Sequence, residues 1–324
     1  MKVNRFILSN RFLEVHIADL GATIMKMVVK DVDSQPVDIV LGFDDADQYA
    51  SADYLSNYPY FGAMMGRCAG RIGNASFTID GTRYALSANV APHHLHGGFS
   101  GFDRKIWTMQ KHDDHTLQLH YVSPDGEEGY PGNLDVTILF QLEEKELKIS
   151  YTATTDKKCP VSLTHHPYFN LCPEQPDIKR QRLRLYSDKY LATEQGISTG
   201  EVLQAEGLYL YDEPKALRAV IEEGNSLDDC YVFGDDGQMK LMAEVSHPDS
   251  KISVALLSDY PAAVVYAGEY IGVRNGKQGR EYQAYAGLAI EPQYSPNTAN
   301  LPSFPSNLLS PGEAYHHTLI YRIS

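Results

Sequence analysis

Apolar and polar residues alternate with a period of two along most of this 324-residue chain. That period is typical of β-strands with one buried face. The clearest signal is a hairpin, in which strands over 77–79 and 82–86 flank Asp80-Gly81, a dipeptide that supplies the positive φ of a two-residue turn. Further strands are predicted over 107–110, 116–122, 136–142, 146–154, 161–163, 182–186, 241–245, 252–257, 263–267, 285–290 and 315–323. Many short strands separated by turn residues predict an all-β fold, a large antiparallel sandwich rather than β–α–β units.

Helical signals are few and short. The sequence predicts helices over 46–50 and over 214–221, where Asp212 would cap the second helix and Pro214 would occupy its first turn. Proline, serine and asparagine cluster over 295–306 and predict a long surface loop directly after Glu291. No shift of composition marks a boundary, so we expect a single domain over 1–324.

The charge balance excludes some classes of partner. The chain has 28 basic and 42 acidic side chains and a formal net charge of −14. Binding to nucleic acid or to an anionic membrane needs clustered lysine and arginine, so we expect neither. The one dense basic run, over 180–184, alternates with apolar positions and indicates a solvated strand face rather than a phosphate cradle.

The cysteines and the N-terminal residues bear on the compartment. Cys68, Cys159, Cys172 and Cys230 are scattered and form no CxxC pair, so neither a zinc site nor a disulfide framework is predicted. No apolar run resembles a secretion signal or is long enough to span a bilayer. We therefore expect a cytoplasmic protein with reduced thiols.

Three short stretches carry residues suited to proton transfer. His96 precedes Gly97-Gly98, which lets the backbone approach a ligand closely. His93, His94 and His96 also raise the alternative of a metal, although zinc would need further ligands and magnesium would need carboxylates. His166 follows the strand predicted over 161–163, and it could equally be a hydrogen-bonded core histidine.

Two carboxylates complete this set. Glu291 ends the apolar run 286–290, where an ionisable side chain costs free energy unless it is paired or functional. A structural salt bridge would explain it equally well. Asp228 lies among turn-forming residues, and a turn carboxylate is the simplest interpretation. Taken singly, none of these residues identifies a site.

Several motifs occur together in a fixed order along nearly the whole chain. They are 66–72 (GRCAGRI), 95–98 (LHGG) with 101–103 (GFD), Trp107, 125–132 (DGEEGYPG), 165–171 (HHPYFNL), Asp228 with Cys230-Tyr231, 291–293 (EPQ) and 309–313 (LSPGE). In this order they resemble the galactose mutarotase (aldose 1-epimerase) family. The resemblance implies a β-sandwich of the galactose mutarotase-like type, with an open cleft on one sheet.

The resemblance also implies roles for individual residues. It makes His166 the general acid and Glu291 the general base, whose opposite charges would keep Glu291 ionised and His166 protonated. It makes Arg71, His96 and Asp228 sugar contacts, with Asn89 and Tyr168 as lesser candidates, and gives His165 no role. It implies a free aldose as substrate, no cofactor, no metal, and a monomer or homodimer.

The chain departs from the family pattern at three positions. Pro292 stands where many relatives have threonine, and it predicts that the strand ends there or lies at an edge. Asn297 replaces an aspartate, and Val264 replaces a glutamine that contacts sugar in some relatives. Three alternatives remain: a phosphosugar or other specialised epimerase, a non-catalytic carbohydrate-binding protein, and a glycosidase that uses Asp228 and Glu291 as its carboxylate pair.

Overall fold

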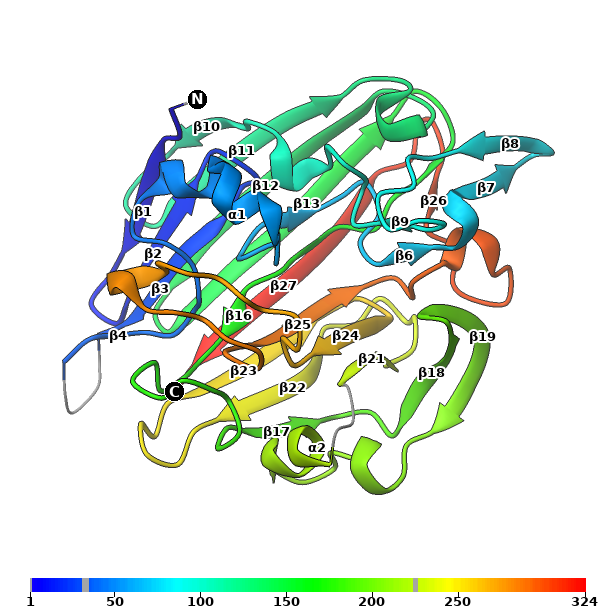
Figure 1. The fold of residues 1–324 in the computed structure, drawn as a ribbon. Helices are drawn as coiled ribbons and strands as arrows, with labels where there is room; N and C mark the ends of the chain where they lie inside the picture. The colour runs from blue at the N-terminus through cyan, green and yellow to red at the C-terminus, as the bar shows by residue number, and fades with distance from the viewer. Residues whose placement is uncertain (1, 31–34, 224–226) are drawn as a thin grey trace.

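Antiparallel sheets dominate the architecture. The computed structural model describes residues 2–30, 35–223 and 227–324 (Figure 1). The largest sheet has nine strands, in the order β10 (Thr108–Lys111), β11 (Thr116–Ser123), β12 (Leu134–Glu143), β13 (Glu146–Thr155), β27 (Tyr315–Ile323), β23 (Ser253–Ser258), β22 (Lys240–Ser246), β17 (Arg182–Leu185) and β20 (Lys215–Ala216). A six-stranded sheet has the order β16 (Tyr168–Phe169), β25 (Leu288–Gln293), β24 (Ala262–Tyr266), β21 (Asp228–Val232), β18 (Lys189–Glu194) and β19 (Ile197–Gln204).

Smaller sheets extend these two. The strands β1 (Arg5–Ser9), β2 (Leu13–Ala18), β3 (Ile24–Val29) and β4 (Val37–Asp38) form a four-stranded sheet. Four two-stranded ladders join β5 (Met64–Met65) to β15 (Thr164–His165), β6 (Arg71–Ile72) to β9 (His94–Leu95), β7 (Ser76–Ile79) to β8 (Thr82–Ala85), and β14 (Cys159–Pro160) to β26 (Leu308–Leu309). The ladders β6–β9 and β5–β15 matter most here, because they carry candidate site residues.

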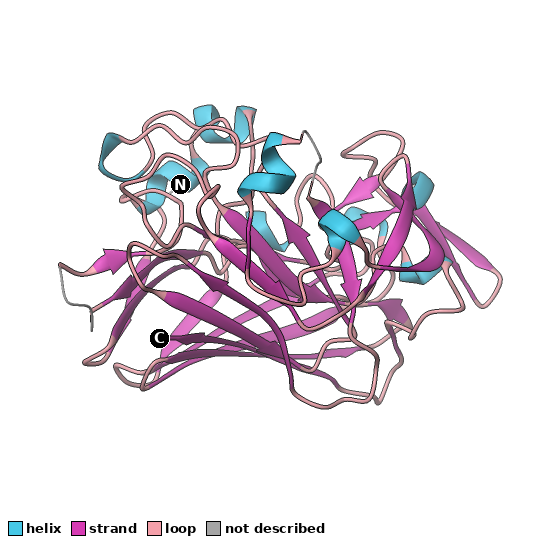
Figure 2. Ribbon diagram, turned by 90° about the horizontal axis from the view of Figure 1, so that it is seen from below, coloured by secondary structure: helices cyan, strands magenta, loops and turns pink. Residues whose placement is uncertain are grey.

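The helices are short and gather on one side of the molecule, away from the layer of long strands (Figure 2). Among the described residues, the α-helices are α1 (Ala52–Ser56) and α2 (Arg218–Glu222). The 3₁₀ turns are η1 (Ala46–Ala50), η2 (Gly73–Ala75), η3 (Phe102–Arg104), η4 (Glu127–Gly129), η5 (Gly207–Tyr209), η6 (Lys277–Gly279) and η7 (Thr298–Asn300).

Alternation along the strands builds one core between the two large sheets. Val136 and Leu319 of the nine-stranded sheet are fully buried, and they belong to the same apolar cluster as Val265 and Ile290 of the six-stranded sheet. Val265 and Ile290 lie opposite each other in the β24–β25 ladder. Since neighbouring residues of a strand point to opposite faces, Glu291 lies on the sheet face that points away from this core.

Most predicted strands are confirmed, including the hairpin. Asp80 and Gly81 have φ values of 48° and 79° between β7 and β8, as a two-residue turn with positive φ requires. The strand predicted over 161–163 is wrong. The backbone N–H of Val161 donates to the carbonyl of Asn307, and that of Leu163 donates to the Tyr315 hydroxyl. Neither bond belongs to a strand ladder.

Two predicted boundaries also differ from the structure. The predicted helix over 214–221 is replaced at its start by β20, whose Lys215 and Ala216 pair with β17, and α2 begins only at Arg218, so Asp212 does not cap it. The strand predicted over 285–290 runs instead from Leu288 to Gln293 and includes Pro292. The strand tolerates this proline because β16 pairs only with Leu288 and Ala289, which leaves no ladder partner on that side of Pro292.

Candidate active site

A cavity of about 200 Å³ lies on the face of the six-stranded sheet that points away from the core. Three adjacent strands, β21, β24 and β25, supply its floor, because alternate residues of each strand point to the same face. We call this set the pocket floor: Asp228, Cys230, Val264, Tyr266, Glu291 and Gln293. Loops and short ladders above the sheet supply the walls.

The β6–β9 ladder brings two of the predicted residues to one wall. Arg71 lies opposite Leu95, so His96 follows directly at the end of β9 and lines the cavity beside Arg71. His96 has φ 51°, and the chain then turns through Gly97. A Cβ atom at Gly97 would lie 1.8 Å from the carbonyl oxygen of Gly66, so only glycine allows this close approach.

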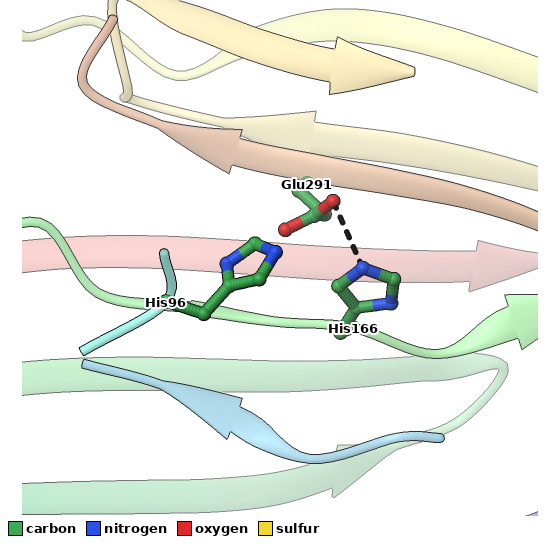
Figure 3. Close-up of side chains that lie close together, drawn as sticks. All are labelled: His96, His166 and Glu291. Carbon is green, nitrogen blue, oxygen red and sulfur yellow. Dashed lines mark ion pairs between the residues drawn. The ribbon is translucent and has the colours of Figure 1, made fainter. Parts of the chain in front are cut away.

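His166 and Glu291 form a buried pair at the centre of the site (Figure 3). The Nε2 atom of His166 lies 3.2 Å from Oε1 of Glu291. The two residues are 3% and 2% exposed. The backbone holds the histidine in place, because its N–H donates to Ala63 and its carbonyl accepts from the N–H of Gly62. An imidazole and a carboxylate at this separation can exchange one proton.

Burial shifts the pKa values of both partners toward their neutral forms. Desolvation lowers the pKa of His166 to about 4. Desolvation also raises the pKa of Glu291 well above its usual value, the negative charge of Asp228 adds to this rise, and Arg71 opposes it. Both shifts favour the neutral forms, a protonated carboxyl group beside a neutral imidazole. Burial thus opposes the charged forms expected from the sequence, an ionised Glu291 beside a protonated His166.

His96 presents a hydrogen-bond donor to the same space. Its Nδ1 atom accepts from the backbone N–H of Gly70 at 3.2 Å, so the ring proton lies on Nε2. Burial lowers the pKa of His96 well below its usual value, and the neighbouring His166 and Arg71 lower it further. The neutral ring stands nearly perpendicular to that of His166, with centroids 5.5 Å apart.

The same three residues could be considered as metal ligands. One candidate ligand atom from each of His96, His166 and Glu291 lies within 4.8 Å of the others. A metal would need an unprotonated nitrogen on His96, but Nδ1 is used by Gly70 and Nε2 carries the proton. His93 and His94 do not line the cavity, and His94 hydrogen-bonds Ser87 and Tyr130. The donor set therefore suits a ligand oxygen better than a metal ion.

Arg71 and Asp228 form the other polar end of the cavity. Arg71 Nη1 lies 3.6 Å from Asp228 Oδ2, and both side chains are partly exposed. Burial raises the pKa of Asp228, while the guanidinium of Arg71 opposes that rise. Arg71 is the one lysine or arginine among the described residues that line the cavity. The pair is therefore suited to hydrogen-bond a neutral, hydroxyl-rich ligand.

Tyr168 lines the cavity as predicted, whereas Asn89 does not. The amide of Asn89 is occupied by the backbone of Leu95, donating to its carbonyl at 2.9 Å and accepting from its N–H at 2.8 Å. Asn89 instead holds Leu95, the residue that precedes His96, and its role as a sugar contact stays a prediction. Val264 lies on the pocket floor, opposite Glu291. Asn297 accepts from the backbone N–H of Gly73.

Sequence reasoning missed several lining residues. Four further tyrosines line the cavity, namely Tyr58, Tyr60, Tyr266 and Tyr270. The Tyr60 ring contacts both His96 and His166, with centroids 5.0 Å and 6.1 Å away. Gln293 and Cys230 complete the floor. The high tyrosine content of the chain, 22 residues, signals such a wall but cannot say which tyrosines form it.

Comparison with known proteins places this geometry in a family. The sequence profile described as aldose 1-epimerase matches residues 4–322. Galactose mutarotase from Mus musculus is 38% identical over 333 residues, covering 99% of this chain and 94% of that protein. Aldose 1-epimerase from Escherichia coli is 30% identical over 326 residues, covering 97% of this chain and 93% of that protein. The chain belongs to the aldose 1-epimerase family.

The fold of this aldose 1-epimerase family member agrees with solved structures. An aldose epimerase homologue from C. elegans superposes with a TM-score of 0.92 at 24% identity, covering 99% of each chain. A galactose 1-epimerase from Lactobacillus acidophilus superposes with a TM-score of 0.81 at 22% identity, covering 100% of this chain and 99% of that one. The predicted galactose mutarotase-like sandwich is confirmed, and the protein is an isomerase that interconverts the anomers of aldoses.

Proposed function

We propose that this protein interconverts the α and β anomers of free aldohexoses, with galactose and glucose as substrates, and that Glu291 and His166 perform the proton transfers. The observation that carries the proposal is the buried His166–Glu291 pair, 3.2 Å apart in a cavity lined with hydrogen-bonding groups. Relatives named galactose mutarotase support galactose as one substrate.

The reaction needs two proton transfers around one ring bond. Glu291 as carboxylate takes the proton of the C1 hydroxyl, while Nε2–H of His166 gives a proton to the ring oxygen and the C1–O5 bond breaks. The open-chain aldehyde then turns about its C1–C2 bond and closes on the other face as both protons return. Each positioned group contributes roughly 10²–10⁴-fold to the rate.

The resting proton arrangement fits this cycle. The pair already holds the single proton that the reaction requires, and the proton must move from Glu291 to His166 when a sugar binds. A bound sugar places its C1 hydroxyl beside Glu291 and its ring oxygen beside His166, so both oxygens can hydrogen-bond the pair. The unpartnered Oε2 of Glu291 supports this arrangement.

The remaining polar groups hold the sugar during ring opening. We assign Arg71 and Asp228 to hydroxyls remote from C1, and Nε2–H of His96 to an oxygen near the reacting carbon. Tyr168 forms part of the aromatic wall, and Asn89 supports His96 indirectly. Without these contacts the flexible open chain would leave before it closed, so they are expected to affect both binding and rate.

The substrate is expected to be small and uncharged. The cavity of about 200 Å³ is smaller than the ~300–1,000 Å³ of drug-sized ligand sites. Arg71 supplies a single guanidinium that already faces Asp228, and Arg182 is exposed on β17, outside the cavity. Specialised phosphosugar chemistry would need a denser basic lining.

We also propose how the protein exists in the cell. The chain acts as one domain over 1–324, as a monomer or homodimer in the cytoplasm, without nucleic acid or membrane partners. Four free thiols and the net charge of −14 support this view. Among the described residues, no helix has the length and apolar character needed to cross a bilayer.

Polarimetry on freshly dissolved α-D-galactose and α-D-glucose tests the activity directly. We expect the enzyme to accelerate the approach to anomeric equilibrium, and to have a higher kcat/KM for each free sugar than for its 6-phosphate. Sugar binding without acceleration would indicate a carbohydrate-binding protein. Release of sugar from a glycoside would indicate hydrolysis by the Asp228 and Glu291 carboxylates instead.

A further inference from the structure

Gln293 of the pocket floor has a buried amide to which the proposed mechanism assigns no role. Gln293 is 0% exposed, and neither its amide nitrogen nor its amide oxygen has a hydrogen-bond partner in the described structure. Buried side-chain amides nearly always have partners, so an unpaired one needs an explanation. A second unpaired group, Oε2 of Glu291, lies on the same strand.

The strand geometry places these two side chains on the same face of the sheet. Glu291 and Gln293 are two residues apart in β25 and point to the same face, with Cα atoms ~6.8 Å apart. Across the ladder they face Val264 and Ala262, which offer no side-chain hydrogen bond. The long side chains of Glu291 and Gln293 can therefore meet, and the opposing strand supplies no competing partner.

The Gln293 amide lies at the side of the pocket floor, next to Gly70. A Cβ atom at Gly70 would lie 3.2 Å from Nε2 of Gln293 and 3.0 Å from the Pro296 ring. The amide thus fills the space that glycine leaves, behind the loop that also holds His96. The amide is as buried as Glu291 and lies on the same pocket floor, so it can act through the neighbouring carboxyl group.

Other titratable groups also surround Glu291 and must be counted. His166 pairs with Oε1, while Arg71 and Asp228 act on the carboxyl group through their charges. The remaining titratable neighbours are His96, Tyr168, Cys230 and Tyr321. None of these groups hydrogen-bonds Oε2, which has no partner among the described residues.

We propose that Gln293 is a positioning residue for Glu291, whose Oε2 receives a hydrogen bond from the Gln293 amide once the carboxyl group has lost its proton. The inference rests on the proposed role of Glu291 as base. In the neutral resting pair the carboxyl group has little need of the donor. In the carboxylate the donor stabilises the charge and turns Oε1 toward the substrate.

The test is the pH profile of Gln293→Met, which keeps the length of the side chain and removes the amide. Losing a donor to a carboxylate raises its pKa. We expect the basic limb of the kcat/KM profile to move up by about one pH unit and kcat to fall about tenfold, with KM little changed. Gln181→Met is the matched control, because Gln181 is equally buried but bonds Leu171 and Phe169 outside the cavity.

Other outcomes would overturn the inference. A raised KM with an unmoved basic limb would make Gln293 a sugar contact, and an unchanged profile with lowered stability would make it a packing residue. If Gln293→Met does not fold, Gln293→Glu keeps the size, and the repulsion of a second carboxylate should move the limb in the same direction. Glu291→Gln separates the two proposals. A wild-type rate in Glu291→Gln would show that Glu291 is not the base, and both proposals would fail. A slow Glu291→Gln enzyme, together with an unshifted basic limb in Gln293→Met, would contradict only the role of Gln293.

Discussion

Two adjacent histidines face the two different interiors of this molecule. His165 points into the core, where Nε2 donates to the carbonyl of Ala22 and Nδ1 accepts from the Tyr151 hydroxyl. His166 points into the cavity, where Nε2 faces Glu291 and Nδ1 has no hydrogen-bond partner among the described residues. Burial lowers the pKa of both rings to about 4. Burial and pKa therefore do not distinguish His165 from His166, the proposed acid, whereas the number of hydrogen bonds made by each ring does.

The largest expected effect is the loss of rate when either member of the His166–Glu291 pair is replaced. Glu291→Gln keeps the size of the side chain and removes the base, and His166→Asn removes the acid. Each should lower kcat by roughly 10²–10⁴-fold, the range that a positioned acid or base supplies. The double variant should be much less damaged than the product of the two single effects, because the groups act in one step. Stopped-flow polarimetry measures all three, and a near-normal kcat in folded Glu291→Gln would move the search for the base to Asp228.

The sequence predicts the main residues of the cavity from its motifs. His166, Glu291, Arg71, His96 and Asp228 follow from ordered motifs, and all five line one cavity. Alternation along the chain also predicts which face each strand buries, because side-chain direction depends only on local geometry. The β7–β8 hairpin is of the same kind, since Asp80-Gly81 alone determines the turn.

Features that depend on distant residues were not predictable. Pro292 does not end β25 but lies where the strand is unpaired on one side, because the pairing of β16 stops at Ala289; the sequence left both outcomes open. The shift of both pKa values toward the neutral forms follows from burial, which a sequence does not show. Asn89 is occupied by Leu95, a contact that motif matching cannot see. In each case the local signal was present, and a tertiary contact decided its meaning.

The next effect concerns the remote end of the cavity. Arg71→Ala and Asp228→Ala each remove one member of a charged pair, and a hydrogen bond to a charged group contributes about 1.5–3 kcal/mol. We expect KM to rise about tenfold or more, with a smaller loss of kcat, whereas His96→Asn should affect both constants. Steady-state polarimetry on galactose and glucose checks this. Unchanged constants for Asp228→Ala on both sugars would show that Asp228 does not help to hold the substrate.

Replacing His165, whose ring nitrogens both have hydrogen-bond partners, should lower stability rather than rate. His165→Asn cannot reach both Tyr151 and Ala22, so it leaves a buried hydroxyl or carbonyl unpaired at about 1–3 kcal/mol per group. Thermal unfolding should show a lower Tm, while kcat of the folded enzyme stays within about threefold of wild type. The same substitution at His166 is the matched comparison, with little change in Tm and a large loss of rate. A rate loss in His165→Asn comparable to that in His166→Asn would contradict the distinction between the two interiors.

The smallest expected effect is a pH-dependent gain in stability from Glu291→Gln. Folding raises the pKa of Glu291 above its ordinary value of 4.5, so the folded protein binds this proton more tightly than the unfolded chain does. The contribution of Glu291 to stability is therefore fully present below pH 4.5 and is lost as pH rises through the folded pKa. Glutamine does not titrate, so the Tm of Glu291→Gln should increasingly exceed that of wild type as pH rises from 5 to 8. Glu14→Gln is the control of opposite sign, because the hydrogen bond from His16 lowers the pKa of Glu14 and makes its carboxylate stabilising above 4.5. If the difference between Glu291→Gln and wild type did not change over this range, the carboxyl group would be ionised in the folded enzyme, and the resting proton would lie on His166 instead.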